Sequence, residues 1–307
     1  MNLAEFVERV FIPKYVMTKR AAGRAHFQAI LKHILTPESS APAFRPGRPP
    51  KMRLAAVPDW PYLDKMRFAE VRPDSVQRLI EALLSRGYST QMATHLRNVI
   101  RNIFSYATTC GYYDGPNPAA MVEVPAIDHK PGRVLTLQQV KQVMDLMRYP
   151  EQHIALFALL TDMNVAEICG LKWKHVNLSN DRRYILEEQL PPRTIAIKMQ
   201  SYRGEYRAVI GKRDRLVPIR EILYSSLTSL RHRREFTSGE DFVLVSRIGT
   251  PVNPDNIATR RLKPIGKTLD MPWLSWKAFH RTRTNLMTQL GGLLNRELEK
   301  ALRLKTW

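Results

Sequence analysis

Cysteine is nearly absent from the 307-residue sequence, which contains only Cys110 and Cys169. Neither residue has a CxxC partner or a histidine nearby at the spacing of metal ligands. The sequence therefore gives no reason to expect a disulfide framework, a bound metal or another cofactor. Because each cysteine lies within an apolar helical pattern, both are predicted to be buried thiols.

Long apolar runs are also missing, and none approaches the ~20 residues that a membrane-spanning helix needs. The first residues, MNLAEFVERVF, carry acidic side chains where a secretory signal would begin with basic ones. We therefore expect a cytoplasmic protein that has no membrane partner.

Acidic residues are scarce relative to basic ones, with 28 Asp and Glu against 48 Lys and Arg and a formal net charge of +20. Up to Val122 there are 17 basic and 9 acidic residues, and beyond it 31 and 19. Because both parts carry the excess, we expect a polyanionic partner that follows a long path over the surface. A solvated surface that only aids solubility is the alternative that charge alone leaves open.

Apolar residues recur at helical spacing in several segments of the first third of the sequence. The predicted helices cover residues 3–11, 27–35, 76–84 and 96–103. Gly87 is expected to follow the end of the third helix, and Ser89 or Thr90 to cap the fourth. The sequence thus predicts a helical N-terminal domain of residues 1–122.

Two parts of this domain are candidates for contact with phosphates. The fourth helix carries Thr94, Arg97, Arg101 and Ser105 opposite its apolar stripe, without an acidic residue. This composition favours phosphate contact over an ordinary solvated face. Residues 42–53 (PAFRPGRPPKMR) predict a basic loop, which either is mobile or lies along a nucleic acid.

A second domain is predicted after a linker of residues 123–133 (EVPAIDHKPGR), which has Pro, Gly and charges but no periodicity. Thr136 is expected to cap its first helix, and the nearly all-apolar residues 151–160 should form a helix of its core. Strands are predicted next, before helices resume. They are an alternating strand in TIAIKM (194–199), two short strands joined by a tight basic turn in AVIGKRDRLVPI (208–219), and a strand in FVLVS (242–246).

Four stretches of this second domain resemble the catalytic domain of tyrosine recombinases, the phage-integrase family. TDMNVAEICGLKWKHVNL (161–178) is similar to TGLRxSELxGLxWxDVDL, which holds the first catalytic arginine. GKRDRLVPI (211–219) resembles the hairpin that holds the catalytic lysine. GTPVNPDNIATRRLKPI (249–265) is similar to the stretch before the second catalytic box, HxLRHT or HxFRRT, which reads KAFHRT (277–282) in this sequence. Four matches in order are far more specific than one.

The N-terminal helices, the basic loop and GYYDGPNPAAMV (111–122) resemble the core-binding domain of the same family. The resemblance therefore covers nearly the whole chain. It implies a mainly α fold with a small β-sheet (α+β), in which a helical core-binding domain precedes a tyrosine-recombinase-like catalytic domain of residues 134–307.

The resemblance also shows which catalytic side chains are missing. Two arginines normally grip the non-bridging oxygens of the DNA phosphate with planar, permanently charged forks. The position of the first arginine is occupied by Asn164, and that of the second by His280. Neither side chain provides a guanidinium, so no intact catalytic site is expected.

Other positions of the site depart less from the family. Lys212 matches the catalytic lysine, but the turn is two residues shorter than usual, so Arg213 and Arg215 stay open as alternatives. Lys277 stands where the family has histidine or lysine. Glu167, the acid that supports the first arginine in the family, is expected to cap a helix or to be solvated instead.

The tyrosine nucleophile of the family has no counterpart in the sequence. By the family's spacing it would lie about thirty or more residues beyond the position of His280, and only 27 residues follow. The last tyrosine is Tyr224, and LGGLLNRELEKALRLKTW (290–307) has no box of the kind that precedes the nucleophile. We therefore expect a domain truncated before the nucleophile.

These features together predict a catalytically inactive recombinase relative that binds double-stranded DNA, as a regulator or as a remnant of a mobile element. The candidate DNA contacts are Arg97, Arg101, Arg260, Arg261 and Arg281.

Two other functions stay open at this stage. The chain could take part in DNA integration with a nucleophile supplied by an intact partner recombinase. It could also be a basic adaptor for RNA or protein, although it lacks an aromatic-rich RNP motif. The oligomeric state is not predicted.

Overall fold

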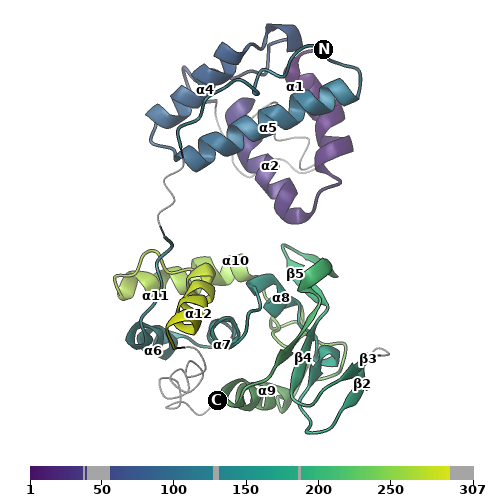
Figure 1. The fold of residues 1–307 in the computed structure, drawn as a ribbon, viewed down its shortest axis with the longest axis vertical. Helices are drawn as coiled ribbons and strands as arrows, with labels where there is room; N and C mark the ends of the chain where they lie inside the picture. Colours follow the sequence, from purple (N-terminus) through teal and green to yellow (C-terminus); the bar gives the residue numbers. More distant parts are fainter. Residues whose placement is uncertain (37–38, 40–55, 127–130, 186–187, 291–307) are drawn as a thin grey trace. The chain divides into compact units, whose positions relative to one another are not determined.

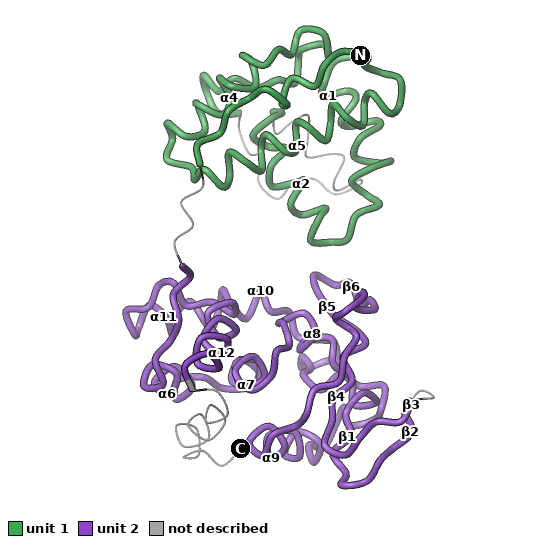
Figure 2. Tube along the Cα trace, in the orientation of Figure 1, with its two compact units in different colours: residues 1–130 green, residues 131–307 purple. Residues whose placement is uncertain are grey.

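The chain forms two compact units in the computed structural model, residues Met1–Lys130 and Pro131–Trp307 (Figure 1, Figure 2). The structure describes residues 1–36, 39, 56–126, 131–185 and 188–290. The predicted basic loop 42–53, part of the predicted linker and nearly all of 290–307 lie outside the described residues.

The first unit is built from helices. They are α1 (Leu3–Phe6), which continues as the π-helix η1 (Val7–Val16), α2 (Ala21–Ile34), η2 (Phe68–Glu70), α4 (Pro73–Ser85) and α5 (Thr90–Thr109). As predicted, the Ser89 side chain caps α5 by accepting a hydrogen bond from the Met92 backbone N–H at 3.2 Å. Phe104 of α5 contacts Phe68 edge to face, with ring centroids 5.2 Å apart, inside a core shared by all these helices.

One sequence prediction for this unit is wrong. Cys110 is exposed, because it follows the last residue of α5 instead of lying within its apolar stripe. The other cysteine, Cys169 of the second unit, is buried as predicted, and burial raises the pKa of its thiol.

The second unit combines helices with small antiparallel sheets. Its helices are α6 (Leu137–Leu146), α7 (Glu151–Leu160), α8 (Val165–Gly170), η3 (Trp173–His175), η4 (Gly211–Arg213), α9 (Glu221–Arg231), α10 (Pro254–Ile257), η5 (Ala258–Leu262), α11 (Lys263–Thr268) and α12 (Trp276–Leu290). Helix α7 is buried almost throughout because it packs against α8, α9 and α12, which explains its nearly all-apolar sequence (Figure 1). Thr136 forms the expected capping box with Gln139 at the start of α6.

The strands pair differently from the sequence prediction. They are β1 (Val176–Asn177), β2 (Arg183–Ile185), β3 (Glu188–Leu190), β4 (Thr194–Ile197), β5 (Met199–Tyr202), β6 (Glu205–Ala208) and β7 (Arg215–Pro218). The strand pairs are β1–β4, β4–β7, β2–β3 and β5–β6, all antiparallel.

Strand β4 is the centre of the three-stranded sheet, and its four residues are all buried rather than alternating as TIAIKM predicted. The segment AVIGKRDRLVPI does not form a hairpin, because β6 pairs with β5 whereas β7 pairs with β4. The hairpin turn lies instead at Arg203 and Gly204, which both have positive φ. FVLVS forms only isolated bridges.

Close packing of α8 on β5 fixes the position of α8. A Cβ atom on Gly170, the last residue of α8, would lie 2.6 Å from the backbone of Gln200. Only glycine permits this approach, so a glycine at the end of α8 is what brings the site described below next to the sheet.

His153 of α7 makes the stability of the second unit depend on pH. Desolvation lowers the pKa of its imidazole to about 4, and the charge of Arg233 acts in the same direction. The unfolded chain, with a histidine pKa near 6.5, therefore binds the extra proton more readily than the folded one between these values. Stability is retained above pH 6.5 and is lost as the pH falls toward 4.

We expect the free energy of unfolding to fall by about 1.5 kcal/mol between pH 6.5 and pH 5 through this group. Urea denaturation of the wild type and of His153→Gln at both pH values measures the difference. Equal pH dependence in the two proteins would contradict the assignment.

Within the described part of the chain, no helix combines the length and the apolar character needed to cross a membrane.

Candidate functional site

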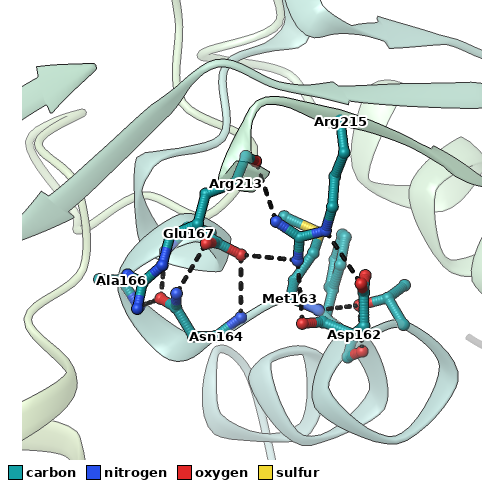
Figure 3. Close-up of polar contacts among 9 residues, drawn as sticks. Asp162, Met163, Asn164, Ala166, Glu167, Arg213 and Arg215 are labelled. Atoms are coloured by element: carbon teal, nitrogen blue, oxygen red, sulfur yellow. Dashed lines mark hydrogen bonds and ion pairs between the residues drawn. The ribbon is translucent and has the colours of Figure 1, made fainter. Parts of the chain in front are cut away.

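Asn164, predicted from the sequence to occupy the position of an arginine, begins helix α8 as its N-cap. Its side-chain oxygen accepts hydrogen bonds from the backbone N–H groups of Ala166 and Glu167, both at 3.0 Å. Its amide nitrogen donates to Glu167 Oε1 at 2.7 Å, and the Glu167 carboxylate also accepts from the Asn164 backbone N–H at 3.1 Å. Both polar atoms of the Asn164 side chain thus form hydrogen bonds at the N-terminus of α8 (Figure 3).

Glu167 is buried, with a side chain only 1% exposed. The expectation that it caps a helix is confirmed, and the alternative that it is solvated is wrong. A buried carboxylate needs a counter-charge as well as hydrogen bonds. The capping box supplies only neutral donors, so the charge has to come from another element.

That charge comes from Arg215, the first residue of β7. Its Nη2 donates to Glu167 Oε2 at 3.1 Å and to the Asp162 backbone oxygen at 3.0 Å, while its Nε donates to Asp162 Oδ2 at 2.9 Å. Its Nη1 donates to the Arg213 carbonyl at 3.0 Å. Figure 3 shows the guanidinium lying between the two carboxylates. Burial disfavours the charged form, but the hydrogen bonds with Asp162 and Glu167 outweigh it and raise the pKa of Arg215.

Pairing with β4 explains why Arg215 reaches this place. The register sets Arg215 opposite Ile197 at the end of β4. Strand β5, against which α8 packs, begins two residues after Ile197. The sheet therefore carries Arg215 to the start of α8, although the two segments are far apart in the sequence.

Lys212 lies in η4, just before β7, and is exposed. Of the three basic residues that the sequence left open in this segment, only Arg215 makes side-chain contacts to the segment around Asn164. Asp214, which follows η4, forms an ion pair with Lys198 at 2.9 Å. Since Lys198 lies between β4 and β5, this ion pair connects the segment before β7 to the sheet region.

Lys277 and His280 both lie on α12 and are both exposed. In the described parts of the chain, no side-chain hydrogen bond or ion pair joins Asn164, Lys212, Lys277 and His280 to one another. The four predicted site side chains are therefore not linked directly, and their assignment to a common site stays a prediction.

The residues after His280 contact the start of the second unit. Arg281 Nε donates to the Arg133 carbonyl at 3.3 Å, and a Cβ on Gly132 would lie 2.5 Å from the same nitrogen. Thr282 is fully buried, and its hydroxyl accepts from the Leu135 backbone N–H at 2.8 Å. The side chain of Arg281, a predicted DNA contact, thus donates a hydrogen bond to the backbone of its own unit.

Arg283, one turn beyond His280, is a further basic residue of this region. Burial lowers the pKa of its guanidinium, while the charge of Asp162 acts in the opposite direction. Its Nε is buried without a hydrogen-bond partner among the described residues. Asp162 therefore interacts with two arginines, through hydrogen bonds with Arg215 of β7 and through its charge with Arg283 of α12.

The predicted phosphate-facing side of α5 is partly covered by the chain that follows it. Arg97 Nη1 donates to the Val122 carbonyl at 3.5 Å, and the Asn117 amide donates to the Arg101 carbonyl and to Ser105 Oγ. The Arg101 side chain stays exposed. In the second unit, Arg260 and Arg261 of η5 are also exposed.

Sequence reasoning missed one member of the site and did not single out another. Asp162 stands where the family pattern TGLRxSEL has glycine, and this acid beside a missing arginine is the signal that could have found it. Arg215 was left as one of three alternatives because only the strand register separates it from Lys212 and Arg213.

Two family models match the sequence. The phage integrase family matches residues 133–294, and the phage integrase central domain matches residues 59–124. No curated protein sequence matches the chain.

Solved structures with the same fold include the Tn1549 transposon integrase in complex with transposon right end DNA. It has 14% sequence identity and a TM-score of 0.67, and the match covers 97% of this chain and 91% of that one. A lambda integrase bound to DNA matches with 12% identity and a TM-score of 0.57, over 97% of this chain and 91% of that one. These neighbours confirm the predicted α+β fold class. Because the phage integrase family model matches more than half of the residues of this chain, the chain belongs to the phage integrase family of tyrosine recombinases.

Proposed function

We propose that this protein binds double-stranded DNA through basic surfaces of its two units and does not cleave it. The family supports DNA as the partner, since both structural neighbours described above are integrases in complex with DNA. The formal charge of +20 supports it independently, because a duplex carries a dense row of phosphates. Arg101, Arg260 and Arg261 are exposed and available for phosphate contacts.

The engagement of Asn164 as a helix cap is the observation that carries the proposed loss of cleavage. Strand cleavage builds negative charge on a five-coordinate phosphorus, which the family offsets with two arginine forks. Asn164 is neutral and its amide is already held by Glu167. By analogy with oxyanion holes, losing one such donor costs about 10²- to 10³-fold in rate, and His280 replaces the second arginine as well.

Salt dependence tests the binding part of the proposal. If Arg101, Arg260 and Arg261 each neutralise one phosphate, a fourfold rise in salt is expected to weaken binding about 40-fold. Fluorescence anisotropy with a labelled duplex at 50 and 200 mM NaCl measures this. An affinity that hardly changes with salt would contradict DNA binding by charge, and stronger competition by RNA than by duplex DNA would favour an RNA adaptor instead.

Covalent trapping tests the second part. A duplex with a nick at the cleavage position captures an active recombinase as a protein–DNA adduct, so we expect none with this protein alone. An adduct with the chain alone would overturn the proposed loss of cleavage. An adduct that forms on an added intact recombinase only when this chain is also present would favour the alternative in which the partner supplies the nucleophile.

A further inference from the structure

The guanidinium of Arg215 is held by four hydrogen bonds. Its hydrogen bonds to Asp162, Glu167 and the Arg213 carbonyl use one N–H of Nε, one of Nη1 and both of Nη2. This leaves one Nη1 N–H without a partner in the described parts of the chain. These hydrogen bonds orient the guanidinium, and the side chain as a whole is 23% exposed.

The guanidinium lies beside the side chain of Asn164. Both groups donate to the same carboxylate, Asn164 to Glu167 Oε1 at 2.7 Å and Arg215 to Glu167 Oε2 at 3.1 Å. The Glu167 carboxylate therefore lies between the neutral side chain of Asn164 and the positively charged guanidinium of Arg215, which comes from β7 (Figure 3). The free Nη1 N–H, joined by the Nε N–H when the Asp162 carboxylate moves away, can donate charge-assisted hydrogen bonds to a phosphate.

Asp162 covers the outer edge of this guanidinium. Its carboxylate accepts from Arg215 Nε and is half exposed. An ion pair with such an exposed partner contributes only about 0–1 kcal/mol, so an arriving anion can displace it, whereas the buried pair with Glu167 stays in place. Arg283 lies close enough to Asp162 for their charges to interact and adds positive potential on that side.

We propose that Arg215 provides a phosphate-binding guanidinium in place of the missing arginine at position 164, and that Asp162 competes with the phosphate for it. The inference rests on the proposed DNA binding for its biological ligand, a backbone phosphate. The anion site itself needs only Arg215, Glu167 and a movable Asp162.

Inorganic phosphate is the probe that tests the site directly. The ¹⁵Nε–¹H signals of arginine side chains are recorded during a phosphate titration at constant ionic strength with chloride, and Arg215→Lys identifies the signal of Arg215. In Asp162→Asn we expect the signal to move at a phosphate concentration about fivefold lower than in the wild type.

Glu221→Gln is the matched control, since Glu221 pairs with Arg193 at 2.8 Å on the surface of the same unit. It should leave the response of Arg215 unchanged. An Arg215 signal that phosphate does not move in Asp162→Asn, or that moves equally in both variants, overturns the inference. If such a protein still binds duplex DNA, the proposed function survives; if phosphate moves the signal but no duplex binds, the proposed function fails instead.

Discussion

Replacing Arg215 by methionine is expected to lower the free energy of unfolding of the second unit by about 3 kcal/mol. The variant keeps most of the side-chain volume but removes the only positive charge that pairs with Glu167 within the described parts of the chain. Glu167 is 1% exposed, so its carboxylate would keep the neutral donors of Asn164 and lose its counter-ion. A buried charge that loses its partner is among the most destabilising changes in a folded protein.

Urea denaturation at pH 7 measures this effect. The double variant Arg215→Met with Glu167→Gln should recover much of the loss, because it removes the unpaired charge as well as its partner. Arg207→Met is the control, since Arg207 pairs with Glu205 at 3.5 Å and its side chain is 51% exposed. Its cost should stay below about 1 kcal/mol. Equal losses in the two single variants would show that Glu167 does not depend on Arg215.

Replacing Phe279 by alanine is expected to destabilise the second unit by about 3–5 kcal/mol. Phe279 is fully buried on α12 and packs in the main core of this unit, with its ring centroid 6.2 Å from that of Trp276. Its burial sets the rotation of α12, which turns Lys277 and His280 toward solvent and Thr282 inward. Truncation would leave a cavity and loosen that setting.

The same denaturation experiment separates packing from surface effects. Lys277→Ala, two residues away on the exposed face, should change stability by less than about 0.5 kcal/mol. Phe279→Leu should cost clearly less than Phe279→Ala, because it retains most of the apolar volume. A small effect of Phe279→Ala would mean that α12 is not held by the core contact described above.

The helices of this protein were largely predictable from its sequence, because their signals are local. The apolar stripe of α5, its cap at Ser89 and the cap of α6 at Thr136 lie within a few residues of the elements they define. The basic composition and the order of the family motifs are also properties of the chain itself, and they indicate the family without tertiary information.

The tertiary structure decided what the sequence left open around the site. Lys212, Arg213 and Arg215 are chemically similar and close in sequence, so only the pairing of β7 with β4 determines which of them reaches Glu167. Burial of residues 194–197 on both faces of β4, rather than on alternate ones, likewise depends on the elements around this strand. The sequence by itself determined the helices, the charge and the presence of Asn164 and His280 at the positions predicted for two arginines. The position of the Arg215 guanidinium beside Glu167 follows from strand pairing, because contacts between distant segments are not encoded in any single one of them.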